Sequence, residues 1–198
     1  WGIRRLIIST YQSITGTGKA AVTQYENERD NKEGEMVYPH RIFENCLPHC
    51  DIFLENGYTK EEMKLVNETR KILSDQEIAI TATAVRVPVM GGHSESINAE
   101  LLKPATLGGI AEALAKAPGV VLLDQPSENE YPMPLQAFDT DEVYVGRLRK
   151  DTSLDNAFNL WVVSDNLRKG AATNAVQIAE TLLKLELITT NTGISTVR

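Results

Sequence analysis

The feature that most constrains the fold is a series of short apolar runs rich in β-branched residues. Such runs, bounded by turn residues, predict β-strands rather than helices. They occur at 6–8, 78–89, 120–123, 143–148 and 160–163, and a further strand is predicted at 94–101, where polar and apolar residues alternate. Helical patterns separate only some of them, so the order lacks the strict strand–helix alternation of a parallel sheet. We therefore predict an α+β domain with one mixed β-sheet and helices packed on one face.

Two of these runs carry a further expectation about burial. Val120–Leu123 and Leu160–Val163 are apolar throughout, without the polar alternation of a strand that faces water on one side. Runs of this kind are typical of strands covered on both faces. We therefore predict that both strands are buried on either side.

The clearest helical pattern lies at 60–73. Thr59 and Glu62 have the spacing of a capping box, and an apolar stripe follows them. Shorter helices are predicted at 19–29 and 106–116.

The C-terminal part of the chain holds one more predicted helix. Ser164, Asp165 and Asn166 offer cap residues for a long helix over 166–184. The tail at 188–198 has no pattern and is predicted to be disordered, which leaves 1–187 as one domain.

Charge and composition exclude several classes of protein. The 198 residues include 20 Lys and Arg against 27 Asp and Glu, a formal net charge of −7, which disfavours a nucleic-acid partner. No apolar run reaches the roughly 18 to 20 residues of a membrane-spanning helix, so no membrane partner is expected either. Cys46 and Cys50 are too few for a secreted disulfide framework and lack the second ligand pair of a zinc site. We expect a cytoplasmic protein without a metal site.

Five residues could carry chemistry. Arg86 interrupts an apolar strand, where either a carboxylate ligand or a structural ion pair would offset its desolvation. His93 follows two glycines that allow close approach, although such a histidine is also common in turns. Glu61 and Lys64 lie three residues apart and share a helix face. They could bind a ligand together or form an ordinary surface salt bridge. Gln12 follows a buried strand, where α/β sheets present ligand contacts, but no Gly-x-Gly-x-x-Gly or Walker pattern is present.

Taken together, four stretches resemble the aspartate-β-semialdehyde dehydrogenase family, in the order that the family has them. They are 9–16, 53–64, 85–89 with 92–95, and 159–172, as in Gly92-His93-Ser94-Glu95. The resemblance covers residues 5 to about 184 and matches the catalytic and dimerisation half of the family. It implies a fold like the C-terminal domain of glyceraldehyde-3-phosphate dehydrogenase, a sheet that forms a homodimer interface, and a last helix that packs on a nucleotide domain.

The resemblance also implies a reaction and a set of substrate contacts. The family interconverts L-aspartyl 4-phosphate and L-aspartate 4-semialdehyde plus phosphate, using NADP, in the biosynthesis of the aspartate-derived amino acids. Glu61 and Arg86 would hold the amino and carboxylate ends of the aspartyl group. Lys64 would meet the phosphate, and Gln12 would contact the substrate at the reaction centre.

The remaining implied roles concern catalysis and the cofactor. His93 would be the acid/base catalyst, acting beside Gln12. Thr15, Gly16 and Asn166 would lie along the nicotinamide cofactor.

One part of the family pattern has no counterpart in the chain. The family's nucleophilic cysteine and its nucleotide domain lie upstream of the first matching stretch, and Cys46 and Cys50 belong to a structural run before Phe53. A covalent intermediate needs that thiolate, so the 198 residues alone are not expected to catalyse the reaction. A homodimer, or a tetramer built from it, is implied. The alternatives are a non-catalytic dimerisation module, including a truncated paralogue, and a related N-acetyl-glutamyl-phosphate reductase.

Overall fold

The computed structural model describes residues 1–188, and its frame is a six-stranded sheet in the order β2-β1-β3-β6-β5-β4. The strands are β1 (Ile3–Ser13), β2 (Ala79–Val87), β3 (His93–Leu101), β4 (Val120–Leu122), β5 (Val143–Lys150) and β6 (Ala157–Ser164). β1 is parallel to β2 and β4 to β5, and the other pairs are antiparallel. The predicted mixed sheet is confirmed. The predicted tail lies outside the described residues, apart from Ile188.

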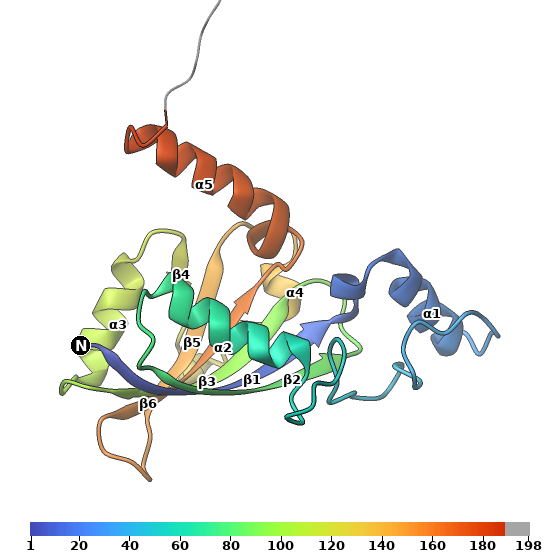
Figure 1. Cartoon of the computed structure of the whole chain (residues 1–198), viewed down its shortest axis with the longest axis horizontal. Helices are drawn as coiled ribbons and strands as arrows, with labels where there is room; N and C mark the ends of the chain where they lie inside the picture. The colour runs from blue at the N-terminus through green and yellow to red at the C-terminus, as the bar shows by residue number, and fades with distance from the viewer. Residues whose placement is uncertain (189–198) are drawn as a thin grey trace, which may run out of the picture.

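Within residues 1–188, five α-helices accompany this sheet, and two of them cover one side of it (Figure 1). The five are α1 (Lys19–Arg29), α2 (Lys60–Ile72), α3 (Leu107–Lys116), the short α4 (Pro134–Ala137) and α5 (Thr173–Lys184). Figure 1 shows α2 and α3 over the same side of the sheet, α1 at one end and α5 projecting from the body. The capping box is formed, because the Thr59 hydroxyl accepts from the Glu62 amide and the Glu62 carboxylate accepts from the Thr59 amide. No helix within the described part of the chain is long and apolar enough to cross a bilayer.

Side chains of β1 alternate between two environments. Leu6 and Ile8 are buried and pack with Leu65 of α2, whereas Ile7 and Tyr11 are 37% and 38% exposed. This period of two is the geometry of a strand covered on one face. The alternation continues to Gln12, which therefore lies on the face that α2 covers.

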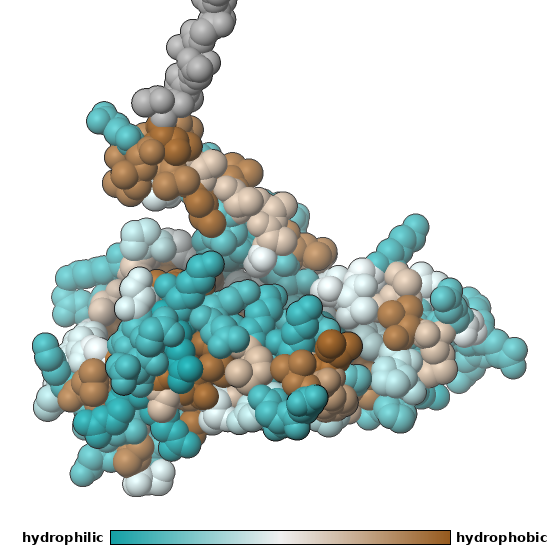
Figure 2. Space-filling model, in the orientation of Figure 1, coloured by the Kyte–Doolittle hydropathy of each residue, from teal (hydrophilic) through white to brown (hydrophobic). Residues whose placement is uncertain are grey.

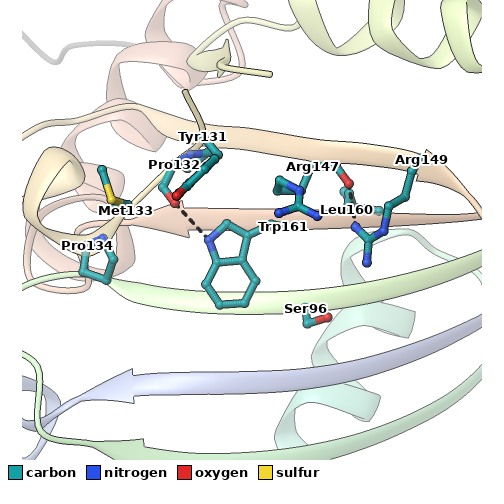
Figure 3. A pocket seen from close by; sticks show the side chains of 9 residues that line it. All are labelled: Ser96, Tyr131, Pro132, Met133, Pro134, Arg147, Arg149, Leu160 and Trp161. Atoms are coloured by element: carbon teal, nitrogen blue, oxygen red, sulfur yellow. Dashed lines mark hydrogen bonds between the residues drawn. The ribbon is translucent and has the colours of Figure 1, made fainter. Parts of the chain in front are cut away.

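We call the other side of the sheet, which carries Ile7, Tyr11, Ser96 and Trp161, the open face. The rings of Tyr11 and Trp161 lie 5.4 Å apart there. The segment before α4 crosses one end of this face, and its Pro132 carbonyl accepts a hydrogen bond from the Trp161 indole at 3.0 Å. Figure 3 shows the hollow beside that contact, with Arg147, Arg149 and Ser96 among its lining residues.

Within one chain, the prediction that two strands are covered on both faces is wrong. β4 is an edge strand, and its Val121 is 37% exposed. β6 is central, yet Leu160, Trp161 and Val162 are only half-buried. The apolar runs were interpreted as in a parallel sheet between two helix layers, but helices cover one face here and the open face lies toward solvent.

The predicted helix over 166–184 is interrupted and starts later as a regular helix. A π-helical turn spans Arg168–Ala172, and α5 follows it. The Gly170 amide donates to the Asp165 carbonyl and the Ala172 amide to the Leu167 carbonyl, both five residues back. Apolar side chains of α5 are exposed, as with Val176 at 57% and Ile178 at 52%. Figure 2 shows hydrophobic side chains gathered on this projecting helix.

Candidate functional site

The candidate site lies where three neighbouring strands meet at one end of the sheet. β1 and β2 are parallel and end together, with Gln12 in register with Arg86. β3 is antiparallel to β1, so it begins at that same end with His93. A cavity of about 500 Å³ opens there, between these strand ends, α2 and the start of the last helical segment. Of the predicted site residues, it is lined by Gln12, Gly16, Glu61, Lys64, Arg86, His93 and Asn166.

Thr15 does not line the cavity but borders it. Its hydroxyl donates to the Asn166 side-chain oxygen at 3.2 Å and lies 2.7 Å from the Ser13 hydroxyl. Ser13 and Thr15 belong to one compact turn. The Ser13 hydroxyl accepts a hydrogen bond from the Thr15 amide at the start of the 3₁₀ turn Ile14–Thr17. The sequence-predicted residues are thus brought together from distant segments, and the bonded pair Thr15 and Asn166 is 151 positions apart.

Arg86 is 92% buried, since its relative exposure is 8%, and points into this cavity. Its Nη1 donates to the Ser13 carbonyl at 2.6 Å, and its Nε has no hydrogen-bond partner. No carboxylate among residues 1–188 forms a salt bridge with it, so the structural ion pair is not what balances this charge. A buried guanidinium with an unpaired donor is costly without a ligand.

Glu61 and Lys64 reach the cavity from the first turns of α2. The Lys64 ammonium lies 3.6 Å from Glu61 Oε2, and Gln12 donates from its amide nitrogen to Glu61 Oε1 at 3.2 Å. The salt bridge foreseen as the alternative therefore exists. It also faces the cavity, because the capping box at Thr59 fixes where α2 begins.

His93 is held by a backbone contact that sets its protonation pattern. Its Nδ1 accepts a hydrogen bond from the Ser13 amide at 3.1 Å, so the proton of the neutral imidazole lies on Nε2. Burial is the main cause that lowers the pKa of His93 to about 4, and the nearby Arg86 charge lowers it further. A hydrogen bond with Gly92 and the charge of Asp165 act in the opposite direction. The imidazole is therefore neutral at neutral pH and presents an N–H donor.

Gly16 lies between the side chains of Arg86 and His93. A Cβ at this position would lie 3.1 Å from Arg86 Nη1 and 3.2 to 3.3 Å from Cε1 and Nε2 of His93. Its backbone φ is not in the left-handed region, so the need for glycine is steric. The missing side chain keeps open the space that Arg86 and His93 share.

Sequence reasoning missed Cys50 and Asp51, which also line the cavity. Cys50 was assigned only to a structural run before Phe53. It is buried, which raises its pKa to about 11 although Arg86 lies close, so it stays a thiol rather than the thiolate that a nucleophile needs. Cys46 is exposed and lies outside the cavity lining. Within residues 1–188, no group of three or more His, Cys, Asp or Glu side chains is placed to hold a metal ion.

The family model for the semialdehyde dehydrogenase dimerisation domain matches residues 1–169. The chain belongs to the semialdehyde dehydrogenase family. An aspartate-semialdehyde dehydrogenase of Aquifex aeolicus is 50% identical over 193 residues, covering 94% of this chain and 57% of that protein. The chain thus spans little more than half the length of the relatives that it matches.

Solved structures of semialdehyde dehydrogenases share the fold. Aspartate semialdehyde dehydrogenase II of Vibrio cholerae, solved as a complex with ASA, superposes with a TM-score of 0.86 at 42% identity. The match covers 92% of this chain and 55% of that one. The Candida albicans enzyme with NADP gives a TM-score of 0.67 at 28% identity, covering 94% of this chain and 52% of that one.

Proposed function

We propose that the chain is the substrate-binding and dimerisation part of an aspartate-semialdehyde dehydrogenase that interconverts L-aspartyl 4-phosphate and L-aspartate 4-semialdehyde plus phosphate. The observation that carries this is Arg86, a buried guanidinium with an unpaired Nε beside a neutral imidazole. The Vibrio cholerae relative complexed with ASA supports the same class of substrate. Substrate contacts are of a kind that a non-catalytic dimerisation module would not need.

Pairing of opposite charges orients the substrate in the cavity. Arg86 presents a planar fork to the substrate carboxylate, and Glu61 accepts from the substrate ammonium. Lys64, whose side chain is 54% exposed, supplies a compact charge to a phosphate oxygen at the mouth of the cavity. Gln12, held by Glu61, contacts the substrate next to the reacting carbon.

His93 moves the proton in this proposal. Its Nε2–H, directed away from the Ser13 amide, donates a hydrogen bond to the oxygen of the reacting carbonyl. As the acid, the protonated imidazole gives its Nε2 proton to that oxygen and becomes neutral, and it takes the proton back in the reverse direction. A substrate carboxylate on Arg86 offsets the positive charge that helps to lower the His93 pKa. Substrate binding therefore brings His93 closer to the range where proton transfer is efficient.

The residues around Gly16 fit the nicotinamide end of NADP. The absence of a side chain at Gly16 leaves a cradle, and Thr15 with Asn166 borders it with polar groups. The Candida albicans relative with NADP supports this cofactor. When bound, the cofactor supplies or accepts the hydride. In the whole enzyme, the exposed apolar side chains of α5 pack on the nucleotide domain.

Kinetics of the whole enzyme test the reaction. We expect phosphate-dependent formation of NADPH from L-aspartate 4-semialdehyde, and no comparable rate with N-acetylglutamate semialdehyde. Arg86→Lys keeps the charge and loses the fork, so KM should rise about 10- to 100-fold, as the loss of a charged hydrogen bond predicts. Arg4→Lys, at an exposed salt bridge with Glu100, is the matched control. An unchanged KM in Arg86→Lys contradicts the assignment.

We further propose that two copies associate through the open face. Ile7, Tyr11 and Trp161 are apolar or aromatic residues on it, and the family model is that of a dimerisation domain. Sedimentation equilibrium should report about twice 21.9 kDa. Ile7→Glu should give a monomer, whereas Ile72→Glu, at a side chain 77% exposed at the end of α2, should not. A monomeric wild-type chain at micromolar concentration contradicts the proposal.

A further inference from the structure

Asp165 is the buried acidic residue at the corner between β6 and the last helical segment. It is 2% exposed and directly follows Ser164, the cross-strand partner of His93. One carboxylate oxygen accepts from the amides of Leu167 and Arg168 at 2.7 and 2.9 Å. The other accepts from the Asp139 amide at 2.8 Å. A single carboxylate therefore joins the corner to the loop after α4.

This loop is itself tied to both sides of the corner. The Arg168 guanidinium binds Asp141 through Nε and Nη2 at 2.7 and 3.0 Å, and Asp139 through Nη1 at 2.9 Å. The Phe138 ring fills the space beside Gly91, so a Cβ at Gly91 would collide with this ring. Gly91 and Gly92 form the turn that delivers His93. Two elements therefore connect Asp165 to His93. One is β6, through Ser164, and the other is the turn before β3, which packs on the loop that Asp165 binds.

The corner also delivers a residue of the cofactor end of the cavity. Asn166 lies between Asp165 and Leu167, whose amide donates to the Asp165 carboxylate. The side-chain oxygen of Asn166 accepts a hydrogen bond from the Thr15 hydroxyl. A capping carboxylate fixes the direction in which a chain enters a helix. The following turn is π-helical, a form that is frequent at functional sites.

We propose that Asp165 is a positioning residue of the site, which fixes the corner that presents Asn166 and places a negative charge next to His93. This rests on the proposed function, since it takes Asn166 and His93 as working residues. Several titratable or charged groups surround the imidazole: Arg86 on β2, Glu61 and Lys64 on α2, Cys50 and Asp51 before α2, Glu95 on β3 and Asp165. The negative charge of Asp165 favours the protonated imidazole and opposes the effect of Arg86.

Two variants separate the cap from the charge. Asp165→Asn keeps a side-chain oxygen for the Leu167 and Arg168 amides and removes the charge. Asp165→Ala removes both. Asp155→Asn, at an exposed position of the turn between β5 and β6, is the matched control. NMR on the 198-residue chain reads the His93 titration, the exchange of the Leu167 and Arg168 amides, and the Asn166 side-chain amide signal.

We expect the His93 titration midpoint to fall below the wild-type value in both Asp165 variants and to stay unchanged in Asp155→Asn. Exchange of the two capped amides should rise about 10-fold or more in Asp165→Ala, as the loss of a charged hydrogen bond predicts, with a shifted Asn166 signal. If Asp165→Ala does not fold, Asp165→Asn still decides the effect on His93. An unchanged His93 midpoint in Asp165→Asn, or an unshifted Asn166 signal in a folded Asp165→Ala, overturns the proposal. These readouts need no turnover, so they are independent of whether the proposed reaction is found.

Discussion

Gly16→Ala is the sharpest test of the space shared by Arg86 and His93. The new methyl group would lie 3.1 Å from Arg86 Nη1 and 3.2 Å from His93 Cε1, where an ordinary contact begins near 3.4 Å. The two neighbours must therefore move apart by a few tenths of an ångström. Arg86 resists because its Nη1 is bound to the Ser13 carbonyl at 2.6 Å, and His93 because its Nδ1 is bound to the Ser13 amide.

The expected size of the effect follows from these displacements. A misplacement of about 1 Å in a catalytic geometry costs on the order of 100-fold in rate, so a few tenths should cost about 5- to 10-fold in kcat/KM. Stability should change little. Overpacking costs about 1 kcal/mol at a site open on one side, and replacing glycine lowers the entropy of the unfolded chain by an offsetting amount.

The assay pairs unfolding in urea with steady-state kinetics of the whole enzyme. Gly108→Ala is the matched control, because its Cβ would have nothing within 4 Å and its helix should gain about 0.5 to 1 kcal/mol. Wild-type kcat/KM in Gly16→Ala, with an unchanged His93 titration, would refute the reasoning. A loss of kcat/KM that follows unfolding of the variant would refute it equally.

Three further outcomes follow from the same structure. His93→Asn should lower turnover about 100-fold while KM changes little, measured across pH in the whole enzyme. In the wild type, the free energy of unfolding should fall as pH drops from 6.5 to about 4, because the unfolded imidazole of His93 takes up a proton that the folded one does not. His93→Asn should therefore show a smaller pH dependence of the urea midpoint over this range. Thr59→Ala should cost about 1 kcal/mol of stability and Thr106→Ala less, because Thr59 is fully buried in a reciprocal capping box with Glu62 and Thr106 caps an exposed turn.

Local signals were sufficient where the chain determines its own structure over a few residues. Thr59 and Glu62 predict the start of α2, and the helix begins at Lys60 as expected. The candidate residues Arg86 and His93 were visible because a charged group in an apolar strand and a histidine after two glycines need a reason. Their convergence was not visible, since it depends on β1 and β2 being parallel and β3 antiparallel.

Features set by distant contacts escaped the sequence. The cap residue Asp165 was foreseen, but not the π-helical turn after it, whose first residue, Arg168, is bound by the distant Asp139 and Asp141. Cys50 joins the cavity because the loop before α2 folds back beside Arg86. Apolar periodicity likewise cannot tell a strand face covered by a helix from one that faces solvent. The predicted burial of β4 and β6 on both faces was wrong for this reason.

The alternation of β1 separates the two proposed activities of the chain. Tyr11 stands on the open face with Trp161, whereas Gln12, the next residue, lies on the other face and donates to Glu61. If both proposals hold, association and substrate binding use opposite faces of one strand. A substitution such as Ile7→Glu can change the oligomeric state while it leaves the cavity side chains in place. A change that reaches both activities must pass through the backbone of β1, where Ser13 supplies both the carbonyl for Arg86 and the amide for His93.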